Sequence, residues 1–337
     1  MRTFFDDVSL EYEEARGGAK GAAQLFDDTN LAERLGAPHA RLRLLTERDV
    51  EALEGRENPL QLLRFKMSQV LIRAALAATG QYGRGLRNAA RVEVRRNRVP
   101  SPRLPKAFCG LTILHLSDLH VDMSEAAMAA VASLVKSLEY DFTVITGDFR
   151  GETFGPFGQT LAQLAAVTEA LRGPIYGVLG NHDCAAMVPG LEKMGVRMLL
   201  NERVAIERRG GRIHLAGIDD THFYRSGSVA RAAAGMPRED FSVLLAHTPE
   251  VYREAESAGF DVMLSGHTHG GQICLPGGIP VTLDAKLPRH MGKGSWRHRK
   301  LHGYTSVGAG SSVVPVRFNC PPEITLHHLH ASGDRRP

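Results

Sequence analysis

The chain has 337 residues, which allows one large domain or two ordinary ones around a substantial core. Its hydrophobic fraction of 43% and charged fraction of 23% are typical of a globular protein rather than a disordered chain. The formal net charge of +4 is modest, so net charge alone gives no reason to expect a nucleic-acid partner.

The cysteines and the N-terminal sequence favour an intracellular protein. The four cysteines, Cys109, Cys184, Cys274 and Cys320, form no CxxC pair. Because a chain of this length needs no disulfides, we expect free thiols in a reducing compartment. The first residues lack the basic-then-apolar layout of a secretory signal, and no uncharged apolar run reaches the ~18 residues of a membrane span. We therefore expect a cytoplasmic location.

Charge is distributed unevenly along the first 110 residues. Residues 1–57 hold 8 Lys and Arg against 13 Asp and Glu, whereas residues 58–110 hold 11 Lys and Arg and a single acid, Glu93. A basic stretch of this kind either contacts anions, such as lipid headgroups or nucleic acid, or forms a solvated linker.

The strongest helix prediction in the N-terminal part covers residues 60–78. Apolar residues recur there at i, i+3 and i+4 spacing, and a second apolar stripe lies on roughly the opposite side. The first stripe contains Leu60, Leu63, Met67, Leu71, Ala74 and Ala78, and the second contains Leu62, Phe65, Ile72 and Leu76. A helix that is apolar on two sides should have two apolar neighbours, one of them the main domain. The other is either a bilayer surface, with the arginines of 84–98 on anionic headgroups, or protein, such as a dimer contact.

The alternation of strands and helices begins at residue 111 and predicts an α/β domain with layered sheets. No strand-like run precedes residue 105, so we divide the chain into a helical extension with a basic linker (1–105), a main domain (106–330) and a polar tail (331–337). Strands are predicted at 111–117, 142–147, 175–179, 213–218, 241–246, 261–265, 304–308 and 323–329. Helices are predicted at 124–138, 159–172, 187–195 and 249–258. Several strands are nearly continuous apolar runs, which is typical of strands buried on both faces.

Five motifs that directly follow apolar runs carry metal-type side chains. They are SDLH (117–120), TGDF (146–149), LGNHD (179–183), AHTPE (246–250) and SGHTHGGQ (265–272). Their oxygen and imidazole donors are Asp118, His120, Asp148, Asn181, His247, His267 and His269. A donor set without cysteine suits manganese, iron or zinc better than a thiolate zinc site. Seven ligands are too many for one tetrahedral ion and match two divalent ions that share a bridging carboxylate.

The ordered set DLH, GDF, GNHD, H and GHTH resembles the calcineurin-like metallophosphoesterases over roughly residues 110–330. The resemblance implies an αββα sandwich of two mixed β-sheets flanked by helices, with a dinuclear site at one rim. It also implies two divalent metal ions, Mn²⁺ before Fe or Zn. In this scheme the first ion is held by Asp118, His120 and His269, the second by Asn181, His247 and His267, and Asp148 bridges them.

The same resemblance assigns a catalytic role to His182, because the corresponding histidine of the family faces the substrate. We expect Asp183 to accept its ring N–H and thereby fix its tautomer. The implied reaction is hydrolysis of a phosphoester by water that the two ions activate, with His182 stabilising the developing charge or protonating the leaving oxygen. We interpret five further histidines as structural: His115, His214, His222, His327 and His328.

The substrate is less clearly indicated. The GHTHGGQI extension, the basic stretch before SDLH and the ending GSSVVPVRFNCPPEI resemble a branch with membrane-associated, lipid-directed enzymes, among them UDP-2,3-diacylglucosamine pyrophosphatases of lipid A synthesis. Members of that branch commonly carry an N-terminal hydrophobic helix, where this chain has the two-striped helix 60–78. Small cyclic-nucleotide diesterases share DxH, GD, GNHD and GHTH and are the alternative. A non-catalytic membrane or partner-binding scaffold is the third hypothesis.

Three residues are candidates for substrate binding. Arg150 lies two residues after Asp148, and the basic segment 278–303 carries Arg289 and Trp296. This segment either closes over an anionic or nucleotide substrate, with Trp296 stacking on it, or is an exposed loop. Together these features predict cleavage of a phosphodiester or pyrophosphate bond in a lipid-linked or nucleotide-sugar substrate. They place the enzyme peripherally on the inner membrane face through residues 60–98, without a nucleic-acid partner.

Overall fold

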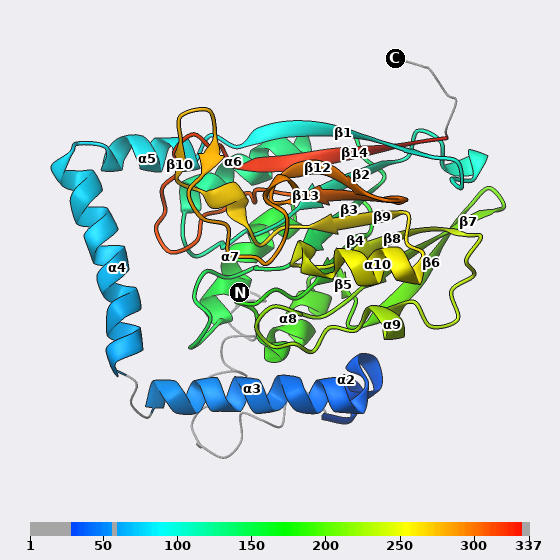
Figure 1. Cartoon of the computed structure of the whole chain (residues 1–337), viewed down its shortest axis with the longest axis horizontal. Helices are drawn as coiled ribbons and strands as arrows, with labels where there is room; N and C mark the ends of the chain where they lie inside the picture. Colours follow the sequence, from blue (N-terminus) through cyan, green and yellow to red (C-terminus); the bar gives the residue numbers. More distant parts are fainter. Residues whose placement is uncertain (1–27, 56–58, 332–337) are drawn as a thin grey trace, which may run out of the picture.

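Two six-stranded mixed β-sheets form the centre of the molecule (Figure 1). The computed structural model describes residues 28–55 and 59–331, so most of the predicted polar tail lies outside the described residues. Within these residues, no helix has the length and apolar character needed to cross a membrane.

The strand order is that of two mixed sheets packed face to face. Sheet A contains, in spatial order, β1 (Glu93–Ser101), β14 (Glu323–Ala331), β2 (Thr112–Leu116), β3 (Phe142–Thr146), β4 (Ile175–Val178) and β5 (Val196–Met198). Sheet B contains β12 (Gly294–His298), β13 (Leu301–Thr305), β9 (Val262–Ser265), β8 (Phe241–Leu245), β7 (Gly211–Gly217) and β6 (Glu202–Arg208). Strands β2 to β5 are parallel, as are β13, β9, β8 and β7. Consequently the carboxyl ends of the central strands lie at one rim, where such folds place their sites.

Helices cover the outer face of each sheet and complete the predicted αββα sandwich. Three of them pack on sheet A: α6 (Glu125–Lys136), α7 (Gly158–Thr168) and α8 (Val188–Lys193). Two short helices pack on sheet B: α9 (Val229–Ala232) and α10 (Tyr252–Ala258). Helix α6 begins where Ser124 Oγ accepts the backbone N–H of Ala127, with Glu125 in its first turn.

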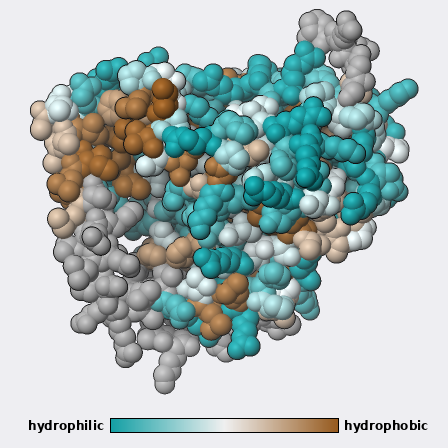
Figure 2. Space-filling view, in the orientation of Figure 1, coloured by the Kyte–Doolittle hydropathy of each residue, from teal (hydrophilic) through white to brown (hydrophobic). Residues whose placement is uncertain are grey.

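The N-terminal helices wrap around one side of the sandwich. They are α2 (Asp28–Leu35), α3 (Ala37–Gly55), α4 (Pro59–Ala78) and α5 (Tyr82–Ala89), and α4 confirms the predicted helix 60–78. Leu31 and Leu35 of α2 join the core under sheet A. Figure 2 shows apolar residues gathered on the side where α4 and the hairpin β10–β11 (Cys274–Leu275 and Ile279–Pro280) lie. An apolar surface therefore lies on the side of the molecule where α4 and the hairpin are found.

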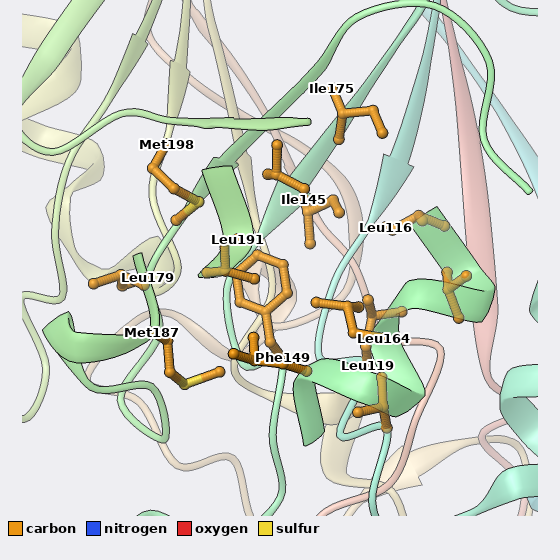
Figure 3. Packing of buried hydrophobic residues seen from close by; sticks show 14 of the residues in the cluster. Leu116, Leu119, Ile145, Phe149, Leu164, Ile175, Leu179, Met187, Leu191 and Met198 are labelled. Atoms are coloured by element: carbon orange, nitrogen blue, oxygen red, sulfur yellow. The ribbon is translucent and has the colours of Figure 1, made fainter. Parts of the chain in front are cut away.

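Apolar residues next to the metal-type aspartates are anchored in the core. Figure 3 shows the Phe149 ring next to Leu191, with Leu119 and Leu164 close by. Phe149 and Leu119 are 0% exposed. Each directly follows a motif carboxylate, Asp148 and Asp118 respectively. Because an interior packs as densely as an organic crystal, these anchors fix the loops that carry the donors.

One expectation for the N-terminal part is wrong. Residues 93–101 form strand β1, which pairs in parallel with the whole of β14 at the edge of sheet A. The strand was missed because its segment VEVRRNRV has exposed arginines where a half-buried strand would have apolar residues. Five more strands, β5, β6, β10, β11 and β12, were also missed, since they are short or alternate weakly at sheet edges. The division of the chain at residue 105 remains a prediction.

Candidate dinuclear metal centre

Every motif begins within three residues of the carboxyl end of a central strand. Asp118 follows β2, Asp148 follows β3 and Asn181 follows β4, all in sheet A. His247 follows β8 and His267 follows β9 in sheet B. The two sheets thus bring the five motifs to one shared rim.

The donors form two groups with one member in common. Asp118, His120, Asp148 and His269 have ligand atoms within 4.8 Å of one another, and so do Asp148, His247 and His267. Asp148 Oδ2 lies 3.6 Å from His120 Nε2 and 3.2 Å from His247 Nε2. Asn181 joins the second group, because its Oδ1 lies 2.9 Å from His247 Nε2. All seven residues selected from the sequence are therefore brought together.

The metal-type residues of the centre are buried except for Asn181. The six aspartate and histidine donors are at most 8% exposed. Asn181 and His182 are half-buried, and the His182 ring lies 5.1 Å from that of His120 between centroids. Asn181 and His182 therefore form an accessible side of the centre.

The ring nitrogens fit divalent cations. His120 Nδ1 lies 2.7 Å from the Arg150 carbonyl, and His247 Nδ1 lies 2.7 Å from the Thr146 carbonyl. A carbonyl only accepts, so both Nδ1 atoms carry a proton and both Nε2 atoms face the centre. His267 Nε2 is a buried nitrogen with no hydrogen-bond partner. Such an orphaned acceptor needs a ligand, and a metal ion satisfies it.

Burial and the shared carboxylate set the charges of these residues. Burial lowers the pKa of His120 to about 3 and that of His267 to about 4, so both imidazoles are neutral ligands at pH 7. Burial alone would also lower the pKa of His247, but the Asp148 carboxylate outweighs it and raises this pKa to about 10. Cation binding is therefore expected to displace a proton from His247.

Close backbone packing at the centre requires two glycines. A Cβ on Gly180 would lie 2.2 Å from Asp148 Oδ1, and a Cβ on Gly266 would lie 2.2 Å from Asp118 Oδ2. Both distances are far inside van der Waals contact. The glycines in LGNHD and SGHTHGGQ therefore let one motif reach the carboxylate of another.

The role predicted for Asp183 needs correction. Its carboxylate accepts the backbone N–H groups of Asp148 (2.8 Å), Gly180 (2.8 Å) and Phe149 (2.9 Å). It therefore holds the loop that carries the bridging residue instead of the His182 ring. The ring partner is Thr153, whose Oγ1 lies 3.0 Å from His182 Nδ1.

Two predicted substrate residues have other contacts. Arg150 is 3% exposed, and its guanidinium donates to the carbonyls of His182 (2.6 Å), Gly155 (3.1 Å) and Thr153. Trp296 is 5% exposed in the core between sheet B and α10, where its Nε1 donates to Thr305 Oγ1 (2.8 Å). Because both side chains are buried on protein partners, the structure does not bring them to the accessible side of the centre.

The segment 278–303 nevertheless adjoins the centre. The carbonyl of Gly292 accepts a 2.6 Å hydrogen bond from Thr268, the residue between His267 and His269. Arg289 is exposed on this segment and donates to the Pro280 carbonyl. The predicted position of the segment beside the metal rim is thus supported, and Arg289 is one of its exposed cations.

Sequence reasoning missed three polar residues around the centre. Thr153 lies in a loop without a recognisable pattern, so nothing in the sequence pointed to it. His222, interpreted as structural, lies with its ring 4.3 Å from that of His267. Its Nδ1 is 3.0 Å from Glu250 Oε2, and Glu250 is the last residue of the AHTPE motif. The signal for His222 was its proximity in sequence to Asp219 and Asp220.

Comparison with known proteins identifies the family. Residues 111–271 match the calcineurin-like phosphoesterase family. The uncharacterized metallophosphoesterase YkoQ of Bacillus subtilis is 33% identical over 235 residues, covering 65% of this chain and 83% of that protein. A transmembrane protein with metallophosphoesterase domain from Bos taurus is 31% identical over 316 residues, covering 83% of this chain and 70% of that protein.

A third relative has a named activity. The phosphodiesterase YaeI of Escherichia coli is 27% identical over 231 residues, covering 64% of this chain and 81% of that protein. The identity to the Bacillus and Bos taurus proteins, over most of their length, agrees with the donor geometry described above. The chain belongs to the calcineurin-like phosphoesterase family and is a metal-dependent phosphoesterase.

Proposed function

We propose that the protein uses two divalent metal ions to hydrolyse a phosphodiester or pyrophosphate bond. The observation that carries this proposal is the sharing of Asp148 Oδ2 between two groups of donors, 3.6 Å from His120 Nε2 and 3.2 Å from His247 Nε2. One oxygen that faces two ligand groups is the arrangement expected of a dinuclear centre. Asp118, His120 and His269 would hold one ion, and Asn181, His247 and His267 the other, with Mn²⁺ as the proposed metal.

When bound, such ions withdraw charge from phosphate oxygens and lower the pKa of water. The accessible His182 is the proton donor of the reaction. As an imidazolium it donates Nδ1–H to Thr153 Oγ1, 3.0 Å away, and leaves Nε2–H free for the leaving oxygen. Arg150 holds the same loop through the His182 carbonyl (2.6 Å). Thr153 and Arg150 therefore act on the reaction by positioning His182.

The exposed apolar residues of α4 support an amphipathic substrate. Met67, Val70 and Leu71 of α4 are 50%, 64% and 63% exposed, whereas Ile72 and Leu76 of the second stripe are half-buried. Figure 2 shows apolar residues on this side of the molecule. The described residues Met67 and Leu71 of the first stripe thus have the uncovered apolar character that a membrane surface would satisfy.

The hairpin β10–β11 adds to this surface next to the metal residues. Leu275, Ile279 and Val281 are 54%, 57% and 60% exposed. Strand β10 begins five residues after His269, so these side chains lie beside the rim of the centre. We propose that α4 and the hairpin rest on the inner membrane face, with the arginines of residues 84–98 on anionic headgroups.

The position of the hairpin next to the metal residues supports one substrate class. A lipid-linked or nucleotide-sugar pyrophosphate, similar to UDP-2,3-diacylglucosamine, would place acyl chains on the hairpin and its phosphates at the ions. Arg289 is the proposed contact for its anionic headgroup. The named membrane character of the Bos taurus relative supports this choice.

The second candidate is a soluble enzyme that cleaves cyclic nucleotides or other phosphodiesters. It is favoured by the name of the Escherichia coli relative, a phosphodiesterase. This candidate needs the same centre and the same His182, but no contact between α4 and lipid.

The test measures metal content and turnover together. Protein loaded with Mn²⁺ is expected to hold two ions and to hydrolyse bis(p-nitrophenyl) phosphate, and Asp148→Asn should lose both properties. Glu139→Gln, the same carboxyl-to-amide change on a side chain 92% exposed, should keep them. A substrate screen with UDP-diacylglucosamine, cyclic AMP and a phosphomonoester then ranks the two candidates. Full activity of the Asp148→Asn protein would rule the proposal out.

A further inference from the structure

A continuous chain of polar side chains, half-buried at Asn97 and buried beyond it, crosses sheet A and ends on Asp118. Its links are Asn97 Nδ2 to His327 Nδ1 (3.0 Å), His327 Nε2 to His115 Nδ1 (3.2 Å) and His115 Nε2 to Thr146 Oγ1 (2.8 Å). It continues from Thr146 Oγ1 to Ser117 Oγ (2.7 Å) and from there to Asp118 Oδ2 (2.6 Å). The chain thus connects β1, β14, β2 and β3 with a proposed metal ligand.

The carboxylate fixes the direction of the hydrogen bonds nearest to it. An ionised Asp118 only accepts, so the Ser117 hydroxyl donates to it and must itself accept from Thr146. The Thr146 hydroxyl has then used its only proton. Its oxygen can therefore only accept from His115, which requires the proton of His115 on Nε2.

The same reasoning fixes the proton position of the second histidine, His327. With its proton on Nε2, His115 accepts at Nδ1, so His327 must donate from its own Nε2. His327 then accepts at Nδ1 from the amide of Asn97, which is a donor. All five bonds therefore point toward Asp118, and each member has one consistent proton position.

The environment keeps the two imidazoles neutral, as this arrangement requires. His115 and His327 are 0% exposed between the sheets, with the ring of Tyr304 from sheet B 4.8 Å from His327 between centroids. Burial lowers the pKa of His115 to about 3 and that of His327 well below its usual value. Only a neutral imidazole donates and accepts at once, so each histidine links two neighbours.

The hydrogen-bond chain acts on one oxygen of Asp118. Oδ2 receives the Ser117 hydroxyl, whereas Oδ1 faces His269 Nε2 at 3.4 Å. The backbone N–H of His267 lies between the two oxygens, 3.0 Å from Oδ1 and 3.1 Å from Oδ2, so the Ser117 hydroxyl is the side-chain donor that distinguishes them. A ligating carboxylate whose second oxygen is hydrogen-bonded is oriented and less basic, and such partners affect metal affinity strongly. The hydrogen-bond chain therefore affects the orientation and the basicity of the Asp118 carboxylate.

We propose that the chain from Asn97 through His327, His115, Thr146 and Ser117 positions Asp118 as a metal ligand. His115, Thr146 and His327 are thus positioning residues of the first ion, not merely satisfied polar groups of the core. The inference rests on the proposed dinuclear function and adds to it the residues that orient one of its ligands from across the sheet.

Strand β3 offers a matched pair of variants for the test. Thr143 and Thr146 lie on the same strand, both 0% exposed, but the Thr143 hydroxyl has no hydrogen-bond partner. Exchange for Val removes one buried hydroxyl in either case. Mn²⁺ titration calorimetry of the full chain should show one binding step weakened about 10- to 100-fold in Thr146→Val. Thr143→Val should bind as the wild type does, and Thr146→Ser, which keeps the hydroxyl, should restore affinity.

A second measurement detects the proton positions in the wild-type protein itself. Nitrogen-15 spectra of the imidazoles, assigned with His115→Gln, should show His115 and His327 with the proton on Nε2 at pH 7. His120 and His247 should show it on Nδ1 in the Mg²⁺- or Zn²⁺-loaded protein. A proton on Nδ1 of His115, or unchanged Mn²⁺ affinity in a folded Thr146→Val protein, would overturn the inference.

The outcomes separate this inference from the proposed function. A wild-type protein that binds fewer than two ions contradicts the proposed function, whatever the tautomers of His115 and His327. A wild type that binds two ions and hydrolyses diesters, beside a Thr146→Val protein equal to it, contradicts the inference alone.

Discussion

Five of the seven metal-donor residues have backbone φ angles between 40° and 70°. They are Asp118, His120, Asp148, His267 and His269. Residues with a Cβ rarely occupy this left-handed region, and each such residue costs on the order of 1–3 kcal/mol. The backbone therefore stays in this form only because the surrounding core and hydrogen bonds hold it. This concentration of strain at one rim supports the proposal that the centre is functional.

The close approach of Gly180 to Asp148 gives a prediction at the residue scale. In Gly180→Ala the new methyl would lie 2.2 Å from Asp148 Oδ1, so the bridging carboxylate must move. We expect loss of at least one Mn²⁺ per chain and a fall in turnover of about 100-fold or more, since a 1 Å misplacement is that costly. Metal analysis and diesterase assays check this. Gly158→Ala, at a position with no atom within 4 Å of the new Cβ, is the control and should match the wild type.

The proton donor gives the second prediction. His182→Ala should keep both ions but lower kcat by about 10²- to 10⁴-fold, because a positioned acid is lost. Thr153→Val should lower kcat less, because the ring keeps its place against His120 but loses its Nδ1 partner. Metal content and kcat at pH 6–9 are the measurements. Unchanged turnover in His182→Ala would refute its role.

At the scale of elements, the buried histidines of sheet A make folding stability depend on pH. The pKa of His115 is about 3 in the fold and about 6.5 in an unfolded chain. The unfolded state therefore binds more protons between these values. Stability from neutral His115 is fully present above pH 6.5 and is lost as the pH falls toward 3, at about 1.4 kcal/mol per pH unit.

This pH dependence can be measured by urea unfolding in EDTA. Between pH 7 and pH 5, the free energy of unfolding should fall by about 2 kcal/mol more in the wild type than in His115→Gln, which cannot titrate. The comparison cancels the contributions of the other histidines. Equal losses in the two proteins would show that His115 does not control acid stability.

The elements predictable from sequence were those whose residues reveal their own burial. Strands β2, β3, β8 and β9 are buried along their whole length, and their apolar runs predicted them within one or two residues. Strand β1 is an edge with exposed arginines, and its place in the sheet depends on β14, more than 200 residues later. No local pattern contains that pairing, so it could not be predicted.

The candidate site also has a part that the sequence predicts and a part that it does not. The seven donors were predictable because five motifs each follow a strand, and carboxyl ends of parallel strands meet at one rim. The contacts of Thr153, Arg150 and Trp296 depend on loop paths and on packing between distant segments, which spacing does not encode. The buried hydrogen-bond chain was hidden for the same reason, since each of its histidines alone looks structural.

For the whole molecule, the apolar surface on α4 predicts binding to lipid vesicles. The wild type should float with phosphatidylglycerol vesicles at low salt, and less so at high salt, since the arginine contacts are screened. Val70→Glu with Leu71→Glu, at positions 64% and 63% exposed, should reduce binding about 10-fold or more. Leu45→Glu in α3, at a leucine 46% exposed, is the control and should float normally. Flotation of the double variant equal to that of the wild type would exclude α4 as the contact.

The parallel pairing of β1 with β14 has a consequence for shortened versions of this protein. Removal of residues 1–105 would take away β1 and leave the nine residues of β14 as an uncovered sheet margin. A long unpaired margin is a template for other chains, so such a fragment should self-associate and precipitate. A fragment that starts before Glu93 keeps the margin covered, and is the form in which the role of the N-terminal helices can be judged without aggregation.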